Sequence, residues 1–217
     1  MQRMLVTIGA LAAVAAAGRV GAQAAAASPA APPVPPPAER QVAGAVTPLP
    51  EPLRAGATVL GYGPEGGRLT SLRRGANDFI CLADDPAQPG FHASCYHKGL
   101  EPFMARGREL REQGKARAAV DSIRQSELRA GRYAIPQNAA LYQLFADAAD
   151  YDPATGAVKN PRALYVIYTP NATPESTGLV AQPVRGGPWI MYPGTPVAHI
   201  MIVPVVPETP RPAGGNP

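Results

Sequence analysis

The sequence predicts an α+β domain in which an antiparallel sheet of short strands carries two or three helices packed on one face. Three observations lead to this prediction. Short segments rich in β-branched and aromatic residues are separated by Gly and Pro turns, two adjacent helical patterns lie between residues 101 and 131, and the sequence shows no internal repeat. Pro-rich segments that we expect to be disordered flank the domain at both ends.

The first 24 residues have the pattern of a secretory signal peptide. Arg3 precedes an apolar run over residues 5–17, and residues 22–24 (Ala-Gln-Ala) fit the rule of small residues at the cleavage site. The run is shorter than the roughly 20 apolar residues that cross a bilayer. We therefore expect a periplasmic or secreted protein with no membrane span after signal removal.

Residues 25–54 are rich in Ala and Pro, and we expect them to form an extended linker. Proline fixes φ and removes a backbone donor, which disfavours both a helix and a strand ladder. Residues 204–217 have a similar composition and are expected to form a disordered tail. Residues 55–203 are therefore expected to form a single globular α+β domain.

The domain begins with strand and turn signals. Residues 57–62, 68–73 and 79–83 have strand patterns, and turns containing Gly or Asn separate them. We expect these three segments to form an antiparallel meander. Residues 91–97 fit either a further short strand or an irregular segment.

Residues 101–114 and 116–131 carry the clearest helix signals. Pro102 suits a first-turn position, and Gly131 ends the second pattern. Apolar residues recur on one side of each helix, and the charged residues between them are expected to face solvent. The apolar residues are Phe103, Met104, Gly107 and Leu110, then Ala116, Ala119, Val120 and Ile123, and the expected solvent side of the second helix holds Arg117, Asp121, Arg124 and Glu127.

The C-terminal half of the domain carries further strand signals. Residues 139–146 fit either a strand or a helix, whereas residues 163–169 form the strongest strand pattern because they are β-branched and aromatic. Residues 173–178 combine a capping Thr, an early Pro and a final Gly, which predicts a short helix. Residues 189–192 and 197–203 are the last apolar segments. Their large side chains suit the core or a pocket wall, and they are Trp189, Met191, Tyr192 and Met201.

The segment from Phe79 to Glu101 holds both cysteines of the chain and two of its three histidines. An even number of cysteines in an exported chain predicts a disulfide between Cys81 and Cys95. Closing a loop of this size contributes roughly 3 kcal/mol in the chain-entropy model. A tetrahedral zinc site is the alternative that the ligand types allow, although the spacing matches no known finger. Its four ligands would be Cys81, Cys95, His92 and His97.

A catalytic metal site is a separate hypothesis. Three ligands and an open coordination position would suit a hydrolase. His199 lies in an apolar strand, which is also typical of a core histidine, and Ser94 near His92 has no role that the spacing alone assigns. We predict no cofactor, and zinc is kept only as an alternative. The candidate metal ligands are His92, His97, His199, Asp84, Asp85 and Glu101.

The net charge and the absence of known catalytic motifs exclude some classes of function. The net charge of +4 includes Arg3 and Arg19 of the signal segment, so the exported chain would carry +2. This charge, with no basic run interleaved with aromatics, argues against a nucleic-acid partner. The sequence has no Gly-x-Ser-x-Gly or Ser-x-x-Lys motif. The leading interpretation is a disulfide-stabilised binding or envelope-associated interaction module with an unknown small-molecule or envelope partner, and the alternative is a periplasmic or secreted metal-dependent hydrolase.

Overall fold

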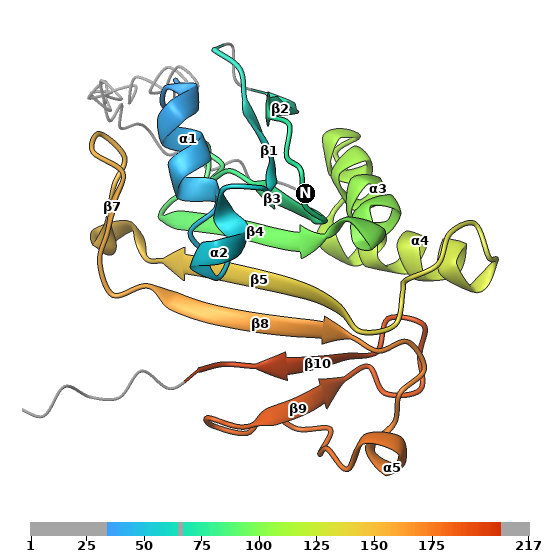
Figure 1. Ribbon diagram of the computed structural model, residues 1–217. Coiled ribbons are helices and arrows are strands. Elements are labelled where there is room, and N and C mark those ends of the chain that lie inside the picture. Colours follow the sequence, from blue (N-terminus) through green and yellow to red (C-terminus); the bar gives the residue numbers. More distant parts are fainter. Residues whose placement is uncertain (1–33, 65–66, 205–217) are drawn as a thin grey trace, which may run out of the picture. The chain divides into compact units, whose positions relative to one another are not determined.

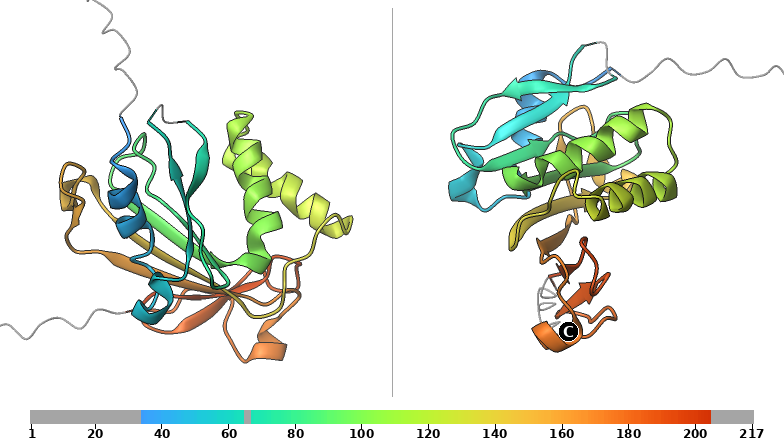
Figure 2. Two further views of the ribbon diagram at one scale, coloured as in Figure 1. Left: turned by 45° about the horizontal axis from the view of Figure 1, so that its top comes forward. Right: turned by 90° about the vertical axis from the view of Figure 1, so that its right-hand side faces the viewer.

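Residues 34–64 and 67–204 are described by the computed structural model of the chain. The predicted signal peptide (residues 1–24), linker residues 25–33 and tail residues 205–217 lie outside this described part. Within it, eight strands form one sheet in the order β2-β1-β3-β4-β5-β8-β10-β9 (Figures 1 and 2). The strands are β1 (Thr58–Tyr62), β2 (Leu69–Arg73), β3 (Phe79–Leu82), β4 (Phe91–His97), β5 (Ala139–Ala146), β8 (Arg162–Tyr168), β9 (Pro188–Met191) and β10 (His199–Ile202).

Three main helices pack against this sheet, which confirms the predicted α+β fold class. The main helices are α1 (Ala38–Ala45), α3 (Glu101–Glu112) and α4 (Arg117–Arg129). The shorter elements are α2 (Glu51–Arg54), α5 (Pro174–Thr177), the 3-10 helices η1 (Lys98–Leu100) and η2 (Ala148–Asp150), and a separate hairpin of β6 (Tyr151–Asp152) and β7 (Ala157–Val158).

The two faces of the sheet are covered by different helices. Successive side chains of a strand point to opposite faces. Cys95 of β4 therefore packs in a core cluster with Ala45 of α1, while its neighbour Tyr96 packs with Phe103 of α3 and Leu128 of α4. Figures 1 and 2 show α1 and the α3–α4 pair on opposite sides of the strands. We call these sides the α1 face and the α3–α4 face.

Residues 38–54 correct the prediction of a linker over residues 25–54. They form α1, α2 and their connection, and Ala45 and Leu49 are each only 1% exposed. The prolines do not prevent this, because Pro37 precedes α1 at its N-cap and Pro52 lies in the first turn of α2. A helix makes no internal hydrogen bond from its first N–H groups, so a proline there costs little. The globular domain therefore begins before α1.

The α3–α4 face is closed by the two helices that the sequence predicts. Phe103, Gly107 and Leu110 are buried on α3, as their spacing indicates, and Val120 is buried on α4. Glu127, which the pattern places toward solvent, is buried as well. Glu127 is buried because it binds charged and polar partners outside α4, and the periodicity of α4 alone cannot reveal them.

The first three strands differ from the predicted antiparallel meander. β1 pairs antiparallel with β2 but parallel with β3, so β1 lies between them. The chain reaches β3 by passing close to the start of β1, where Ala76 N and Asn77 N donate to Gly56 O at 2.7 and 2.9 Å. Gly75 allows this approach, since a Cβ there would lie 2.3 Å from backbone atoms of residues 56–58.

The two ambiguous segments form the strands that position the candidate sites. Residues 91–97 form β4 and residues 139–146 form β5, and each strand is hydrogen-bonded on both sides. Pairing on both sides satisfies the backbone groups that an isolated segment would leave to water. The alternation along β4 then decides which of its side chains reach each face.

Candidate ligand-binding cleft and the predicted site residues

The structure contains the predicted disulfide between Cys81 and Cys95. The two residues lie directly opposite each other in the register of β3 and β4, and both are 0% exposed. The Cys95 Sγ atom lies 3.1 Å from the carbonyl oxygen of Ala45, in the last turn of α1. The disulfide is thus part of the core beneath α1, and its sulfurs are not free to act as the thiolate ligands of the alternative zinc site.

The three histidines lie on different parts of the sheet. His92 and His97 stand at opposite ends of β4 and on opposite faces, because five residues separate them along an alternating strand. The Nδ1 atom of His97 accepts a hydrogen bond from Gly99 N at 3.1 Å. His199, on β10, lies between the rings of Tyr168 and Tyr192, with centroid distances of 5.1 and 5.7 Å.

The candidate acids have separate partners. Asp84 Oδ1 accepts from the backbone N–H of His92 at 2.8 Å, and Asp85 Oδ1 accepts from Ala87 N at 3.0 Å. Glu101 instead binds Tyr96 OH and the Arg108 guanidinium at 2.5 Å each. In residues 34–64 and 67–204, no three His, Cys, Asp or Glu side chains are grouped so that they could hold a metal ion. The structure therefore does not bring the six candidate ligands together.

His92 belongs to a polar cluster on the α3–α4 face. Its Nε2 atom lies 3.2 Å from Ser94 Oγ and 3.3 Å from Gln143 Nε2, and Gln143 Nε2 also donates to Ser94 Oγ at 3.1 Å. An amide nitrogen only donates, so these contacts require that His92 Nε2 is an acceptor. Burial lowers the pKa of His92, which favours this neutral form.

Gln143 connects this cluster to a cleft between the helices and the sheet. The cleft has a volume of about 280 Å³ and lies over β5, β8 and β10, with α4 along one side. Its sheet side is mostly apolar, whereas arginine, aspartate and amide groups stand on the helix side. The lining residues are Phe103, Arg117, Asp121, Arg124, Gln125, Leu141, Gln143, Leu164, Val166, Tyr168, Met191, Tyr192, Val197, His199 and Met201.

The charges of the cleft favour an anionic group. Arg124 donates to Asp121 Oδ1 at 2.8 Å and lies over the ring of Phe103, 4.0 Å from its centroid. Arg117 is exposed at the rim and forms no ion pair with any residue in the described part of the chain. Two arginines against one aspartate leave the cleft with a local excess of positive charge.

His199 and Tyr168 lie on the sheet side of the cleft, which we call its floor, and their side chains stay neutral near pH 7. Burial lowers the pKa of His199, although its bond to the Val197 carbonyl opposes this effect. The Nδ1 atom of His199 lies 2.7 Å from that carbonyl oxygen and must donate to it, which leaves Nε2 as an acceptor. Burial also raises the pKa of Tyr168 to about 12. The floor thus offers apolar surface with neutral polar groups.

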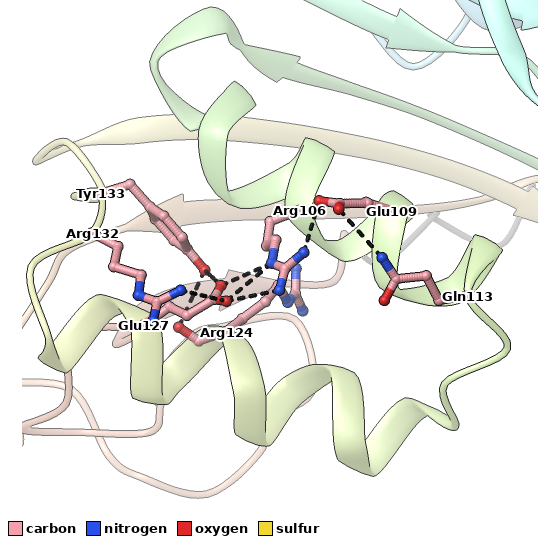
Figure 3. A network of polar contacts seen from close by, with 7 residues as sticks. All are labelled: Arg106, Glu109, Gln113, Arg124, Glu127, Arg132 and Tyr133. Carbon is pink, nitrogen blue, oxygen red and sulfur yellow. Dashed lines mark hydrogen bonds and ion pairs between the residues drawn. The ribbon is translucent and has the colours of Figure 1, made fainter.

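The helical wall of the cleft is fixed by a polar network between α3 and α4 (Figure 3). Arg106 donates from Nε to both oxygens of Glu127, at 3.1 and 3.0 Å, and from Nη2 to Oε1 at 2.9 Å. The hydroxyl of Tyr133 lies 3.2 Å from Glu127 Oε2, and Arg132 Nη1 lies 3.7 Å from Oε1. These contacts, with the Arg106 hydrogen bond first, lower the pKa of Glu127 and hold α4 beside α3.

Sequence reasoning missed most of this cleft. Arg117, Asp121 and Arg124 were expected to be solvated, but they line it. Of the large residues near the C-terminus, Met191, Tyr192 and Met201 also line it, whereas Trp189 is 7% exposed in the core. The one available signal was the cluster of Met and aromatic residues, which suits a pocket wall as well as a core.

Comparison with known proteins adds no relative. No protein family model, curated protein or solved structure matches the chain. Among the helices of residues 34–64 and 67–204, none has both the length and the apolar composition required to cross a membrane.

Proposed function

We propose that this chain is an exported, disulfide-stabilised binding module whose ligand site is the cleft between α4 and the sheet. The observation that carries the proposal is the cleft itself, where polar groups of α4, β5 and β10 converge over an apolar floor. Binding pockets for small molecules commonly combine mainly apolar walls with a few placed polar groups. Export is supported by the signal-like first 24 residues and by the disulfide.

The ligand class follows from the lining. A small molecule with an apolar body and one anionic group would place the body against Leu164, Val166 and Met201 and the anion toward Arg117 and Arg124. Arginine binds carboxylates through a planar pair of donors, which orients such a group. An envelope component of this chemistry is included in the proposal.

Calorimetric titration of the purified chain with octanoate and with octanol tests this proposal. Octanoate is expected to bind more tightly, and Arg117→Gln should weaken its binding by about tenfold, as the loss of a charge-assisted contact predicts. Arg129→Gln is the matched control, because Arg129 is also exposed on α4 but does not line the cleft. Equal binding of octanoate and octanol, or equal effects of the two substitutions, would contradict the proposal.

The alternative, a metal-dependent hydrolase, has less support because its candidate ligands are distributed over both faces of the sheet. Elemental analysis of the purified chain tests it directly. Stoichiometric zinc that is lost on His92→Ala would favour the hydrolase over the binding module.

A further inference from the structure

A second cavity lies on the opposite side of the sheet from the cleft. Its volume is about 250 Å³, and α1, the start of β4 and the β6–β7 hairpin surround it. Figure 1 shows the hairpin beside α1. This volume is slightly below the usual range of about 300–1,000 Å³ for ligand pockets, so the cavity suits a small ligand. The lining residues are Pro36, Arg40, Gln41, Ala43, Gly44, Thr47, Asp84, Phe91, Tyr151, Thr155 and Gly156.

Asp84 is the acidic group of this cavity. Its carboxylate accepts a hydrogen bond from His92 N at 2.8 Å, and Tyr151 lines the same cavity. Across residues 34–64 and 67–204, no lysine, arginine or histidine forms an ion pair with Asp84. A partly buried carboxylate is normally paired with a cation, because burial removes its hydration. The neighbouring Asp85 adds repulsion, which a cation would relieve.

The basic residue that lines the cavity, Arg40, has other partners. The Arg40 Nη1 atom donates to the carbonyl oxygens of Pro153 and Ala154 in the turn of the β6–β7 hairpin. The guanidinium is therefore used to hold the hairpin beside α1. The amide of Gln41 is also satisfied, since it donates to Pro36 O and Tyr62 O and accepts from Tyr62 N. Asp84 and Tyr151 are left as the polar pair of the cavity.

The walls near this pair are aromatic. The rings of Phe91 and Tyr151 lie 5.3 Å apart at an angle of 50°. Gly44 of α1 leaves room beside them, since a Cβ at this position would lie 3.5 Å from the Phe91 ring. An aromatic face attracts a cation through its quadrupole, and this attraction is strongest where water is excluded.

We propose that this cavity binds a small organic cation, such as a primary or methylated ammonium ion. Asp84 is its counter-ion, the His92 N–H orients the carboxylate, and the rings of Phe91 and Tyr151 contact the apolar part of the ligand. An ammonium group supplies the missing positive charge and the N–H or C–H surface that a carboxylate and an aromatic wall recognise. The site is separate from the proposed cleft and goes beyond the function proposed for it.

Titration of the purified chain with benzylamine, benzyltrimethylammonium and benzyl alcohol tests the proposal at neutral pH. The two cations are expected to bind at least about tenfold more tightly than benzyl alcohol, the neutral isostere of benzylamine, as a charge-assisted contact requires. Asp84→Asn should weaken the binding of both cations by about the same tenfold factor. Asp85→Asn is the matched control, because it removes one charge from the same loop without touching the cavity lining.

Circular dichroism and thermal unfolding show whether Asp84→Asn folds. If that variant does not fold, Asp84→Glu keeps the charge and should retain the preference for cations over the alcohol. Equal binding of cations and alcohol overturns the proposal, as does unchanged binding by folded Asp84→Asn or no cation binding at millimolar concentration. Arg117→Gln should leave cation binding unchanged, so failure of this site and failure of the cleft proposal are distinguishable.

Discussion

Asp84 shows how a single side chain responds to its surroundings. Burial raises its pKa from 3.8 to about 6, and the charge of Asp85 adds to the effect, while the hydrogen bond from His92 N opposes it. Tyr62, whose pKa is raised to about 12 mainly by burial and further by Asp85 and Asp84, lies in the same acidic neighbourhood. The folded protein therefore holds the Asp84 proton more tightly than the unfolded chain does.

The sign of the pH dependence follows from this difference. Below pH 3.8 the carboxyl is protonated in both states, and between 3.8 and about 6 the folded state binds more protons, so stability from this group falls as pH rises and then levels off. Asp84→Asn should thus raise the unfolding free energy at pH 8 by about 1 kcal/mol, a value reduced for the partial exposure of the group, and leave it unchanged at pH 3. Urea unfolding of both proteins at the two pH values checks this. A larger gain at pH 3 than at pH 8 would show that the sign is wrong.

Residue types alone predicted the disulfide but could not assign the metal candidates. Two cysteines in an exported chain have one pairing. For His92 and His97, the direction of each side chain depends on the strand register, and one residue of slippage exchanges the faces. The register is fixed by pairing with β3 and β5, and β5 lies far outside the segment that contains these two histidines.

At the scale of elements, α1 shows where composition is insufficient. Its segment is short and rich in Ala and Pro, so no local pattern predicts a stable helix. Tertiary packing supplies the stability, since Ala45 and Leu49 cover the disulfide. The helices α3 and α4 were predictable because their apolar spacing and their Pro and Gly boundaries are local.

Leu49→Ala tests whether this segment belongs to the core. Leu49 is 1% exposed, so its truncation should lower the unfolding free energy by about 2–5 kcal/mol through lost burial and a new cavity. Val34→Ala is the control, because Val34 is 81% exposed. Denaturant titration measures both variants. If residue 49 lay in a solvated linker, the two substitutions would have the same negligible effect.

Glu127→Ala tests the network between α3 and α4. The side chain of Glu127 is 9% exposed, whereas that of Arg106 is 26% exposed and also binds Glu109. Removal of Glu127 takes away the carboxylate that accepts from Arg106 Nε and Nη2, and should lower the midpoint of thermal unfolding by about 2–4 °C. Glu109→Ala serves as the control, since Glu109 also binds Arg106 but its side chain is 54% exposed. Thermal unfolding compares the two. A Glu109→Ala effect as large as that of Glu127→Ala would contradict the assigned role of burial.

At the scale of the whole molecule, the disulfide joins two neighbouring strands of the central sheet. It links β3 to β4 beneath α1 and closes the loop that carries Asp84. Replacing Cys81 and Cys95 together by Ala should lower the unfolding free energy by about 3 kcal/mol, as the closed loop length predicts. Guanidinium titration of the oxidised protein and of the double variant measures this. The prediction would be wrong if the two midpoints coincided.

The sequence predicted the fold class but not the strand order or the cleft. The fold class follows from hydrophobic periodicity within each segment, which can be read directly from the sequence. The parallel pairing of β1 with β3 and the meeting of Arg124, Gln143 and His199 depend on contacts between distant segments. Contacts of this kind produce no periodic pattern in the sequence, and no family model matches the chain from which they could be inferred.

His92 makes contacts on both sides of the sheet. Its backbone N–H holds Asp84, whereas its ring holds Ser94 and Gln143 at the end of the cleft. A ligand that moves the Asp84 carboxylate away from this N–H would therefore shift His92, whose ring contacts Gln143 in the cleft on the other face. By thermodynamic linkage, the factor by which a ligand of the cavity changes the affinity of the cleft equals the factor by which a ligand of the cleft changes the affinity of the cavity.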